Sequence, residues 1–485
     1  MRREIWICIA ASLAVRGWLT SAHRIDSDEP QHLHVAWAAA HGFVQYRDVF
    51  DNHLPLLHGL FAPVMALMPE SSDVFLLMRL AIAPFALACA WLLYEYARPL
   101  WGERVAATAA LAFSVIPPWL PKSVEFRNDT LWIFFWLAAL VLMTRNKPLL
   151  AGLALGLAML ASIKTVPLIL AHVLALATER KKFELAPAMR VAAGIALPAI
   201  ATAVWMLTHG ALDDMLYATV LFNSATPVHE ARRIGGVVAF MFLAPSILWI
   251  GRRALHLTLF AIWYVVLLLC FWPIITPRDF LPLAPLFALA VAARWPSWRP
   301  FALVAIGIVA ALIDARVWRG TERVREQFVD EVVRLTKPGD LVYDLKGENV
   351  FRRRPVFPIY EDVGRALTAN GTLADTGPED ITRHGCCAAV RDNDHIPPRT
   401  RAFLNRHFIE SGPLTRVCGT RVESNSFEIA VPQTYAVLAR DPASVAIDGV
   451  PYRGPRPLRA GPHTLSRGTN ERVTIVWWRA SKEAS

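Results

Sequence analysis

Acidic and basic side chains gather in one stretch near the start of the chain, between two apolar segments. Asp26, Asp28 and Glu29 precede residues 30–42, which have the pattern of a helix that begins with Pro and ends with Gly. A second polar group comes before the next apolar run and comprises Arg47, Asp48, Asp51, Asn52 and His53. Carboxylates at a membrane face are costly unless they bind or react with something. This stretch is therefore the first candidate for a site.

Two later loops between apolar runs carry matching side chains. The first holds Lys122, Glu125, Arg127 and Asp129, and the second holds Thr276, Arg278 and Asp279. Arginines suit phosphate oxygens, because the planar guanidinium donates to two of them at once. A carboxylate suits removal of the proton from a hydroxyl or amine nucleophile. The three groups together predict chemistry on a lipid phosphate and a nucleophile, and the alternative is a set of interfacial salt bridges that contribute little.

A metal site is the competing chemical interpretation of the first stretch. Asp26, Asp28, His32 and His34 are suitable ligand types. His32 and His34 diverge on a helix because they are two positions apart, whereas Asp28 and His32 share a face. The sequence has no Cys-x-x-Cys pair and no zinc-ligand spacing. A divalent metal is left open but not favoured, and we expect no cofactor.

Composition divides the chain into two parts. The 485 residues are 55% hydrophobic with a mean hydropathy of +0.36, and long apolar runs are confined to residues 1 to about 314. A spanning helix needs about 20 apolar residues, so we predict a polytopic, mainly α membrane domain at 1–314 and a soluble part after it. Many of the basic residues behind the net charge of +10 lie in short loops, where topology explains them, so nucleic-acid binding is not expected.

About eleven transmembrane helices are expected. They are 1–20, 75–96, 104–120, 129–144, 148–162, 165–178, 189–208, 234–250, 254–272, 279–293 and 300–314. Residues 54–68 are short for a span, so 21–73 form a first outer loop whose two helices lie along the outer face. Basic residues such as Arg98, Lys181 and Arg252 then face the cytoplasm with the N-terminus. An odd number of spans places the C-terminal part outside.

Lys164 lies at a bend between two short apolar runs, 148–162 and 165–178. A charge at that depth faces a cavity or an interface inside the protein. Alternatively, its long side chain reaches the outer surface.

The soluble part predicts an α/β module at 315–431, followed by a small β-rich unit at 432–485. Helical spacing is found at 321–336 and 399–408, and short strand-like runs follow residue 432. No P-loop, Rossmann glycine pattern or nucleophile elbow occurs. In an oxidising compartment Cys418 would form a disulfide with Cys386 or Cys387, and the sequence leaves open which.

The chain resembles the GT-C superfamily of integral-membrane glycosyltransferases, in particular bacterial relatives of protein O-mannosyltransferases and aminoarabinose transferases. The resemblance covers residues 1–314, and its motifs are Asp28-Glu29, YRDVFDNHLPL at 46–56, FRND at 126–129 and PRDFLP at 277–282. It implies a polyprenyl-phosphate sugar as donor, Asp28 as catalytic base with Glu29 beside it, and Asp129 or Glu125 as the acid of the second loop. The family usually has Lys-Pro at His53-Leu54, and that lysine is associated with the donor phosphate. We therefore expect His53, Arg127 and Arg278 at the phosphate.

We expect an inverting, metal-independent sugar transfer to an acceptor on the extracytoplasmic side of a membrane, in the bacterial inner membrane. The acceptor is a glycan, a lipid or a protein, and Asp26, Arg47, Asp51, Glu125 and Lys164 are further candidates for the site. The alternatives are a transporter or flippase of lipid-linked glycans and a structural or assembly subunit. A transporter would place its charges near the bilayer midplane, often in repeated halves, and the sequence shows no internal repeat.

Overall fold

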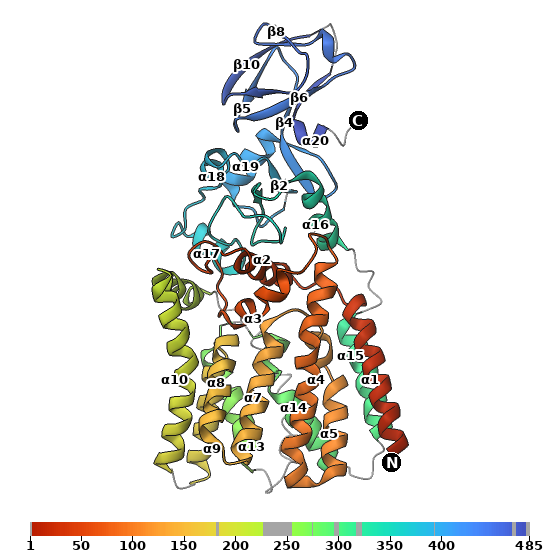
Figure 1. Ribbon diagram of the computed structural model, residues 1–485, viewed down its shortest axis with the longest axis vertical. Coiled ribbons are helices and arrows are strands. Elements are labelled where there is room, and N and C mark those ends of the chain that lie inside the picture. Colours follow the sequence, from red (N-terminus) through yellow and green to blue (C-terminus); the bar gives the residue numbers. More distant parts are fainter. Residues whose placement is uncertain are drawn as a thin grey trace.

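The structure, a computed structural model, describes residues 2–180, 184–226, 255–273, 275–294, 300–316, 323–391, 393–467 and 472–481. A bundle of roughly parallel helices carries the C-terminal part on one end, and the N-terminus lies at the opposite end (Figure 1). The predicted span at 234–250 lies outside the described residues, as do Lys181 and Arg252.

The bundle is built from long helices joined by short ones. The long helices are α1 (Arg2–Ala22), α4 (Val74–Trp101), α5 (Glu103–Val115), α7 (Asn128–Thr144), α8 (Pro148–Ala161), α9 (Thr165–Thr178), α10 (Leu185–Thr208), α13 (Leu255–Phe271), α14 (Leu283–Arg294) and α15 (Pro300–Ala315). The short ones are α2 (Glu29–Ala40), α3 (Leu56–Met65), α6 (Trp119–Ser123), α11 (Leu212–Leu216), a π-helix (Tyr217–Phe222) and a 3₁₀ helix (Pro277–Phe280). Both α2 and α3 lie at the end of the bundle that faces the C-terminal part (Figure 1).

Within the described ranges, α1, α4 and α10 are the three helices long and apolar enough to cross a membrane. The other apolar helices have 10–17 residues. The organisation into a helical membrane part and a later part with strands is confirmed, and the number of eleven spans stays a prediction.

Small residues bring some helices into close contact. A Cβ added to Gly152 of α8 would lie 2.1 Å from the carbonyl oxygen of Val191 in α10, and one added to Gly194 would lie 2.3 Å from that of Leu149. Glycine at both positions lets the two backbones approach without a side chain between them, as is common between helices in membranes.

Arg16, which interrupts the apolar run of α1, is 5% exposed. Its guanidinium donates to Ser123 Oγ at 2.9 Å and thereby connects α1 with the segment before α7.

The C-terminal part opens with α16 (Val324–Leu335) and combines further helices with two sheets (Figure 1). Its helices are α17 (Asp362–Ala369), α18 (Gly377–Arg383), α19 (Pro398–His407) and α20 (Trp478–Ser481). Its strands are β1 (Val342–Tyr343), β2 (Ala388–Val390), β3 (Phe408–Glu410), β4 (Thr415–Val422), β5 (Ser426–Ile429), β6 (Gln433–Leu438), β7 (Ala446–Ile447), β8 (Val450–Pro451), β9 (Arg456–Leu458), β10 (Gly461–Ser466) and β11 (Val473–Trp477).

Among the described residues, one sheet has seven strands in the order β1-β2-β4-β11-β6-β9, with β3 also on β4, and the other has four in the order β5-β10-β7-β8. β1 and β2 are parallel, and the other pairs are antiparallel. The larger sheet crosses the expected boundary at residue 432, because β11 pairs with β4 on one side and β6 on the other. A disulfide joins Cys387 to Cys418, and Cys386 is a buried free thiol.

Candidate active site

Arg127 and Arg278 lie at the centre of an ionic cluster where three loops meet. Arg127 donates to Asp26 at 2.5 Å and to Asp28, and its Nε lies 3.4 Å from Asp129 Oδ2. Arg278 donates to Asp26 and Asp129, both at 2.9 Å, and to Glu125. The first outer loop, the segment before α7 and the 3₁₀ helix before α14 therefore supply one site. The polar groups of these three loops, which the sequence predicts to act together, thus lie side by side in the structure.

Local structure explains how these side chains reach the cluster. Asp129 lies in the first turn of α7, where a negative charge is favourable beside the positive end of the helix dipole. In the 3₁₀ helix Pro277–Phe280, Asp279 accepts from the backbone N–H of Thr276 at 2.6 Å and from its hydroxyl at 2.8 Å. This capping box fixes the short turn that carries Arg278.

Glu125 is the most deeply buried acid of the cluster, with no exposed side-chain surface. It accepts from Lys122 at 3.1 Å, and His23 Nε2 lies 3.0 Å away. Burial raises the pKa of Glu125, but Arg278, His23 and Lys122 outweigh burial and hold it well below the usual range. A carboxylate with these partners serves to hold Arg278 rather than to take up a proton.

Asp28 differs from the other acids, because its second oxygen faces the C-terminal part. Asp28 Oδ2 accepts from Arg127, whereas Oδ1 accepts from Lys346 Nζ at 2.9 Å. Lys346 also contacts Glu361. Burial raises the pKa of Asp28, but Arg127, Lys346, His53 and His32 together hold it well below the usual range. Asp28 is thus kept as a carboxylate, with one oxygen on the outer side of the arginine pair.

The loop that carries Lys346 is held against α2. Gly347 follows with a φ of +94°, and a Cβ there would lie 2.5 Å from the ring of His34. His34 Nδ1 lies 2.9 Å from the carbonyl oxygen of Val350. Further along, Arg352 donates to Glu70 in the first outer loop at 2.8 Å. The close approach at Gly347 therefore places Lys346 over Asp28.

Glu29 occupies a different position from the one expected for a catalytic partner. Its carboxylate accepts from Arg79 at 2.6 and 2.7 Å, from the N–H of Asp26 at 2.9 Å and from the N–H of Phe126 at 3.1 Å. Glu29 is completely buried, and Arg79 is 3% exposed. These contacts clamp the first outer loop to α4 and to the segment before α7, so Glu29 positions Asp26 and Asp28 and faces away from the arginine pair.

Asp51 and His53 belong to a polar network beneath Asp28. Asp51 is buried and accepts from Gln31 and Gln45, each at 2.8 Å, and His53 Nδ1 lies 2.9 Å from it. The His53 ring centroid is 4.5 Å from that of His32, and the His53 side chain is 26% exposed. His53 therefore borders the cluster and has one ring nitrogen engaged by Asp51. Asp51 supports His53 in this position.

Arg47 and Lys164 were further expected site residues. Arg47 lies apart from the arginine pair, since it donates to Asp48 at 2.8 and 2.9 Å and to the carbonyl of His209 at 2.7 Å. Lys164 lies at the bend between α8 and α9 and pairs with Asp279 at 2.8 Å. Of the two, Lys164 thus supports the turn of Arg278, and Arg47 is a surface contact.

The proposed metal ligands are separated. His32 Nδ1 lies 3.0 Å from His58 Nε2, His34 contacts Val350, and Asp26 and Asp28 share Arg127. Over the described ranges, no three His, Cys, Asp or Glu residues are grouped as a metal site requires.

An apolar groove of about 530 Å³ begins beside the cluster and lies between α5, α14 and α15. Its walls include Ile116, Phe280, Leu283, Leu303 and Ile306. Phe280 follows Arg278 by two positions in the same 3₁₀ helix. The groove therefore reaches the short helix that carries Arg278.

Lys346 and Glu361 were missed by the sequence reasoning. Both lie in the soluble part, more than 300 residues along the chain from Asp28, and the residues around them have no motif of their own. The concentration of charge in KGENVFRRR at 346–354 was the available signal.

Comparisons with known proteins give one family match and two similar folds. The family described as dolichyl-phosphate-mannose-protein mannosyltransferase matches residues 53–206. The crystal structure of ArnT from Cupriavidus metallidurans bound to undecaprenyl phosphate matches with a TM-score of 0.60 and 14% identity, over 85% of this chain and 97% of that chain. The apo state of ArnT from the same organism gives a TM-score of 0.58, with the same identity and coverage. Comparison with curated proteins gives no match.

At this identity the structural likeness establishes the fold. Together, the ArnT-like fold and the mannosyltransferase match within the membrane part confirm the resemblance of this chain to the GT-C superfamily of integral-membrane glycosyltransferases.

Proposed function

We propose that this protein transfers a sugar from a polyprenyl-phosphate carrier to a nucleophile, with Asp28 as the general base. The observation that carries the proposal is the position of Asp28, which has one oxygen on Arg127 and the other on Lys346 of the C-terminal part. Asp26 has both oxygens on the arginine pair, and Glu125 and Asp129 are occupied by Arg278. Asp28 is therefore the acid best placed to meet an incoming acceptor.

The donor is assigned to the apolar groove and the arginine pair. A prenyl chain suits the groove between α5, α14 and α15, because its walls are apolar. Its phosphate would then reach Arg278 and Arg127, whose guanidinium groups bind phosphate oxygens in place of some of the carboxylates. The likeness to ArnT, which was solved with undecaprenyl phosphate, supports a polyprenyl phosphate as carrier.

The chemical step is a single displacement at the anomeric carbon. The acceptor O–H or N–H passes its proton to Asp28 while its lone pair forms the bond to that carbon. The bond from the anomeric carbon to the phosphate oxygen breaks, and the phosphate leaves with the electron pair, neutralised by Arg127 and Arg278. Attack opposite the leaving phosphate inverts the anomeric configuration. We expect this step to need no metal ion, which transfer in excess chelator would test.

The acceptor is assigned to the side of Asp28 on which the C-terminal part lies, which we place outside the cytoplasm of a bacterial inner membrane. Two observations support this orientation. The N-terminus and the C-terminal part lie at opposite ends of the bundle (Figure 1), and a disulfide joins Cys387 to Cys418 in the C-terminal part, as suits an oxidising compartment. The acceptor is a glycan, a lipid or a protein, and the chemical nature of the labelled product distinguishes the three.

The test supplies radiolabelled polyprenyl-phosphate sugars to membranes that contain the protein and to membranes that lack it. The proposal predicts that label from one of these donors moves into a product that depends on the protein. Movement of the intact labelled carrier across the membrane, without transfer of the sugar, would instead support a flippase.

A further inference from the structure

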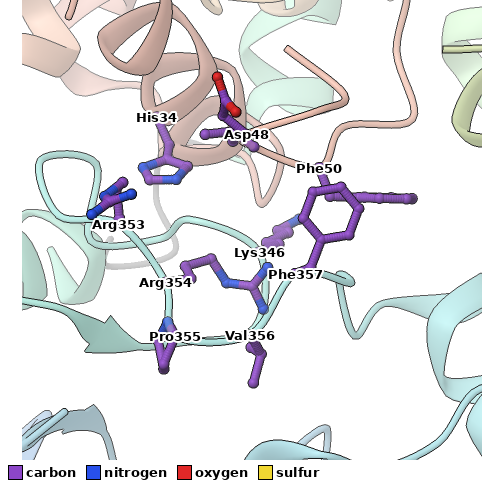
Figure 2. A pocket seen from close by; sticks show the side chains of 10 residues that line it. His34, Asp48, Phe50, Lys346, Arg353, Arg354, Pro355, Val356 and Phe357 are labelled. Atoms are coloured by element: carbon purple, nitrogen blue, oxygen red, sulfur yellow. The ribbon is translucent and has the colours of Figure 1, made fainter. Parts of the chain in front are cut away.

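A second cavity lies on the other side of Lys346, between the first outer loop and the C-terminal part. It has a volume of about 150 Å³, and its lining includes Asp48, Phe50, Lys346, Arg353, Arg354 and Phe357. Figure 2 shows the three basic side chains around it, with Asp48 and Phe50 contributed by the first outer loop. A water molecule occupies about 30 Å³ of liquid, so the cavity suits one compact group.

Most of the charged groups around this cavity are paired with one another. Arg354 pairs with Asp344 at 3.0 Å, Lys346 pairs with Asp28 and Glu361, and Asp48 is held by Arg47. The Arg353 guanidinium, by contrast, makes no hydrogen bond or ion pair within the described part of the chain. It lies 5.0 Å from the ring centroid of Phe43. Among the described residues, Arg353 is therefore the cation at this cavity whose guanidinium N–H groups have no acceptor.

Lys346 is shared between this cavity and the reacting centre. Its Nζ lies 2.9 Å from Asp28 Oδ1 and its side chain is 2% exposed, while the same residue lines the cavity. A group bound beside Arg353 thus lies next to a nucleophile placed at Asp28. The apolar groove, which suits a prenyl chain, begins instead beside Arg278. The cavity consequently belongs on the acceptor's side of the site.

We propose that this cavity binds a compact anionic group of the acceptor, a phosphate or a carboxylate, through Arg353. The proposal rests on the proposed function and gives the acceptor its chemical class: a glycan or glycolipid with an anionic substituent near the hydroxyl or amine that receives the sugar. Arginine binds both kinds of oxyanion through paired N–H donors. The rings of Phe50 and Phe357, whose centroids are 5.5 Å apart, provide an apolar wall for the rest of the acceptor.

The binding test uses the full-length purified protein with methyl phosphate and methyl glucuronate as probes, titrated by calorimetry. We expect one of them to bind, and its identity distinguishes a phosphate from a carboxylate. Arg353→Gln should weaken that binding by about tenfold or more, because a charge-assisted hydrogen bond contributes about 1.5–3 kcal/mol. The matched control is Arg391→Gln, which removes an exposed arginine of the same domain that pairs with Glu410, and it should bind like the unchanged protein.

Arg278→Gln separates the two anion sites, since it impairs the donor's phosphate site and should leave the Arg353 binding event in place. The proposal is overturned if neither probe binds, or if Arg353→Gln binds as tightly as the unchanged protein. These binding measurements need no turnover. Failure of sugar transfer would therefore refute the proposed function, whereas the binding of an anion at Arg353 is decided by the titrations alone. Where transfer occurs, envelope extracts fractionated on an anion-exchange resin should yield the acceptor in the retained fraction, and an acceptor in the flow-through contradicts the proposal.

Discussion

Replacing Lys346 with methionine should move the acid limb of the pH–rate profile to higher pH. Lys346 Nζ lies 2.9 Å from Asp28 Oδ1 and helps to hold the pKa of Asp28 well below its usual range. Two unit charges about 4 Å apart interact by about 4 kcal/mol at an effective dielectric constant of about 20, which corresponds to about 3 pKa units. Asp28 is 21% exposed and solvent weakens the interaction, so the pKa of Asp28 should rise by only part of this amount.

The direction in which the acid limb moves follows from the role of Asp28 as a base. A general base acts as its carboxylate, so the rate falls when the pH drops through the pKa of Asp28. Without the ammonium group this pKa is higher, and the fall therefore begins at a higher pH. The assay is the initial rate of labelled sugar transfer across a pH series at saturating donor.

The matched control is Glu361→Gln. Glu361 shares Lys346 with Asp28, so its removal leaves the ammonium to Asp28 alone. The acid limb should then stay in place or move to lower pH. An acid limb that Lys346→Met leaves unmoved, or that both variants move upward equally, would refute the coupling of Lys346 to the base.

Three further changes test the supports of the site. Glu29→Gln breaks a buried, doubly hydrogen-bonded pair with Arg79 and should cost about 3–5 kcal/mol of stability, seen as a lower thermal unfolding midpoint; an unchanged midpoint argues against the clamp. Gly347→Val should loosen the contact of the C-terminal part with α2 and speed proteolysis of the C-terminal part. Gly449→Ala, at a φ of +75° in open space, should not do so. Equal proteolysis rates in the two variants would contradict the role of Gly347 in this contact. His53→Lys should retain transfer and extend it to higher pH, while His53→Ala should raise the donor concentration needed for half-maximal rate; equal donor dependence in all three proteins removes His53 from the site.

Loop composition predicted that Asp28, Arg127 and Arg278 lie at one face, but it did not predict that Arg47 lies apart from them. Asp28, Arg127 and Arg278 lie far apart in the sequence, but each is in a polar loop between apolar runs, and topology brings such loops to one face. The roles within the cluster were harder to predict. Glu29 and Asp28 are adjacent acids, and only the position of Arg79 distinguishes the clamp from the candidate base.

The contribution of the C-terminal part was not predictable from the sequence. Lys346 reaches Asp28 because Gly347 packs against His34, and such a contact between distant segments leaves no periodic or local pattern. The pairing of β11 with β4, which crosses the predicted boundary at 432, has no local signal for a related reason, since it joins segments about 50 residues apart. A short strand can be predicted from its own residues, whereas the strand that pairs with it cannot.

The most direct test of the central claim compares Asp28→Asn with Asp26→Asn in the labelled-donor assay. Both substitutions remove one negative charge beside Arg127, so a general effect of charge on donor binding appears in both. A general base contributes about 100- to 10,000-fold to rate. We predict that Asp28→Asn loses turnover by a factor in this range, with expression and donor binding retained, and that Asp26→Asn loses much less. Near-normal turnover in Asp28→Asn, together with loss in Asp26→Asn, would show that Asp28 is not the base.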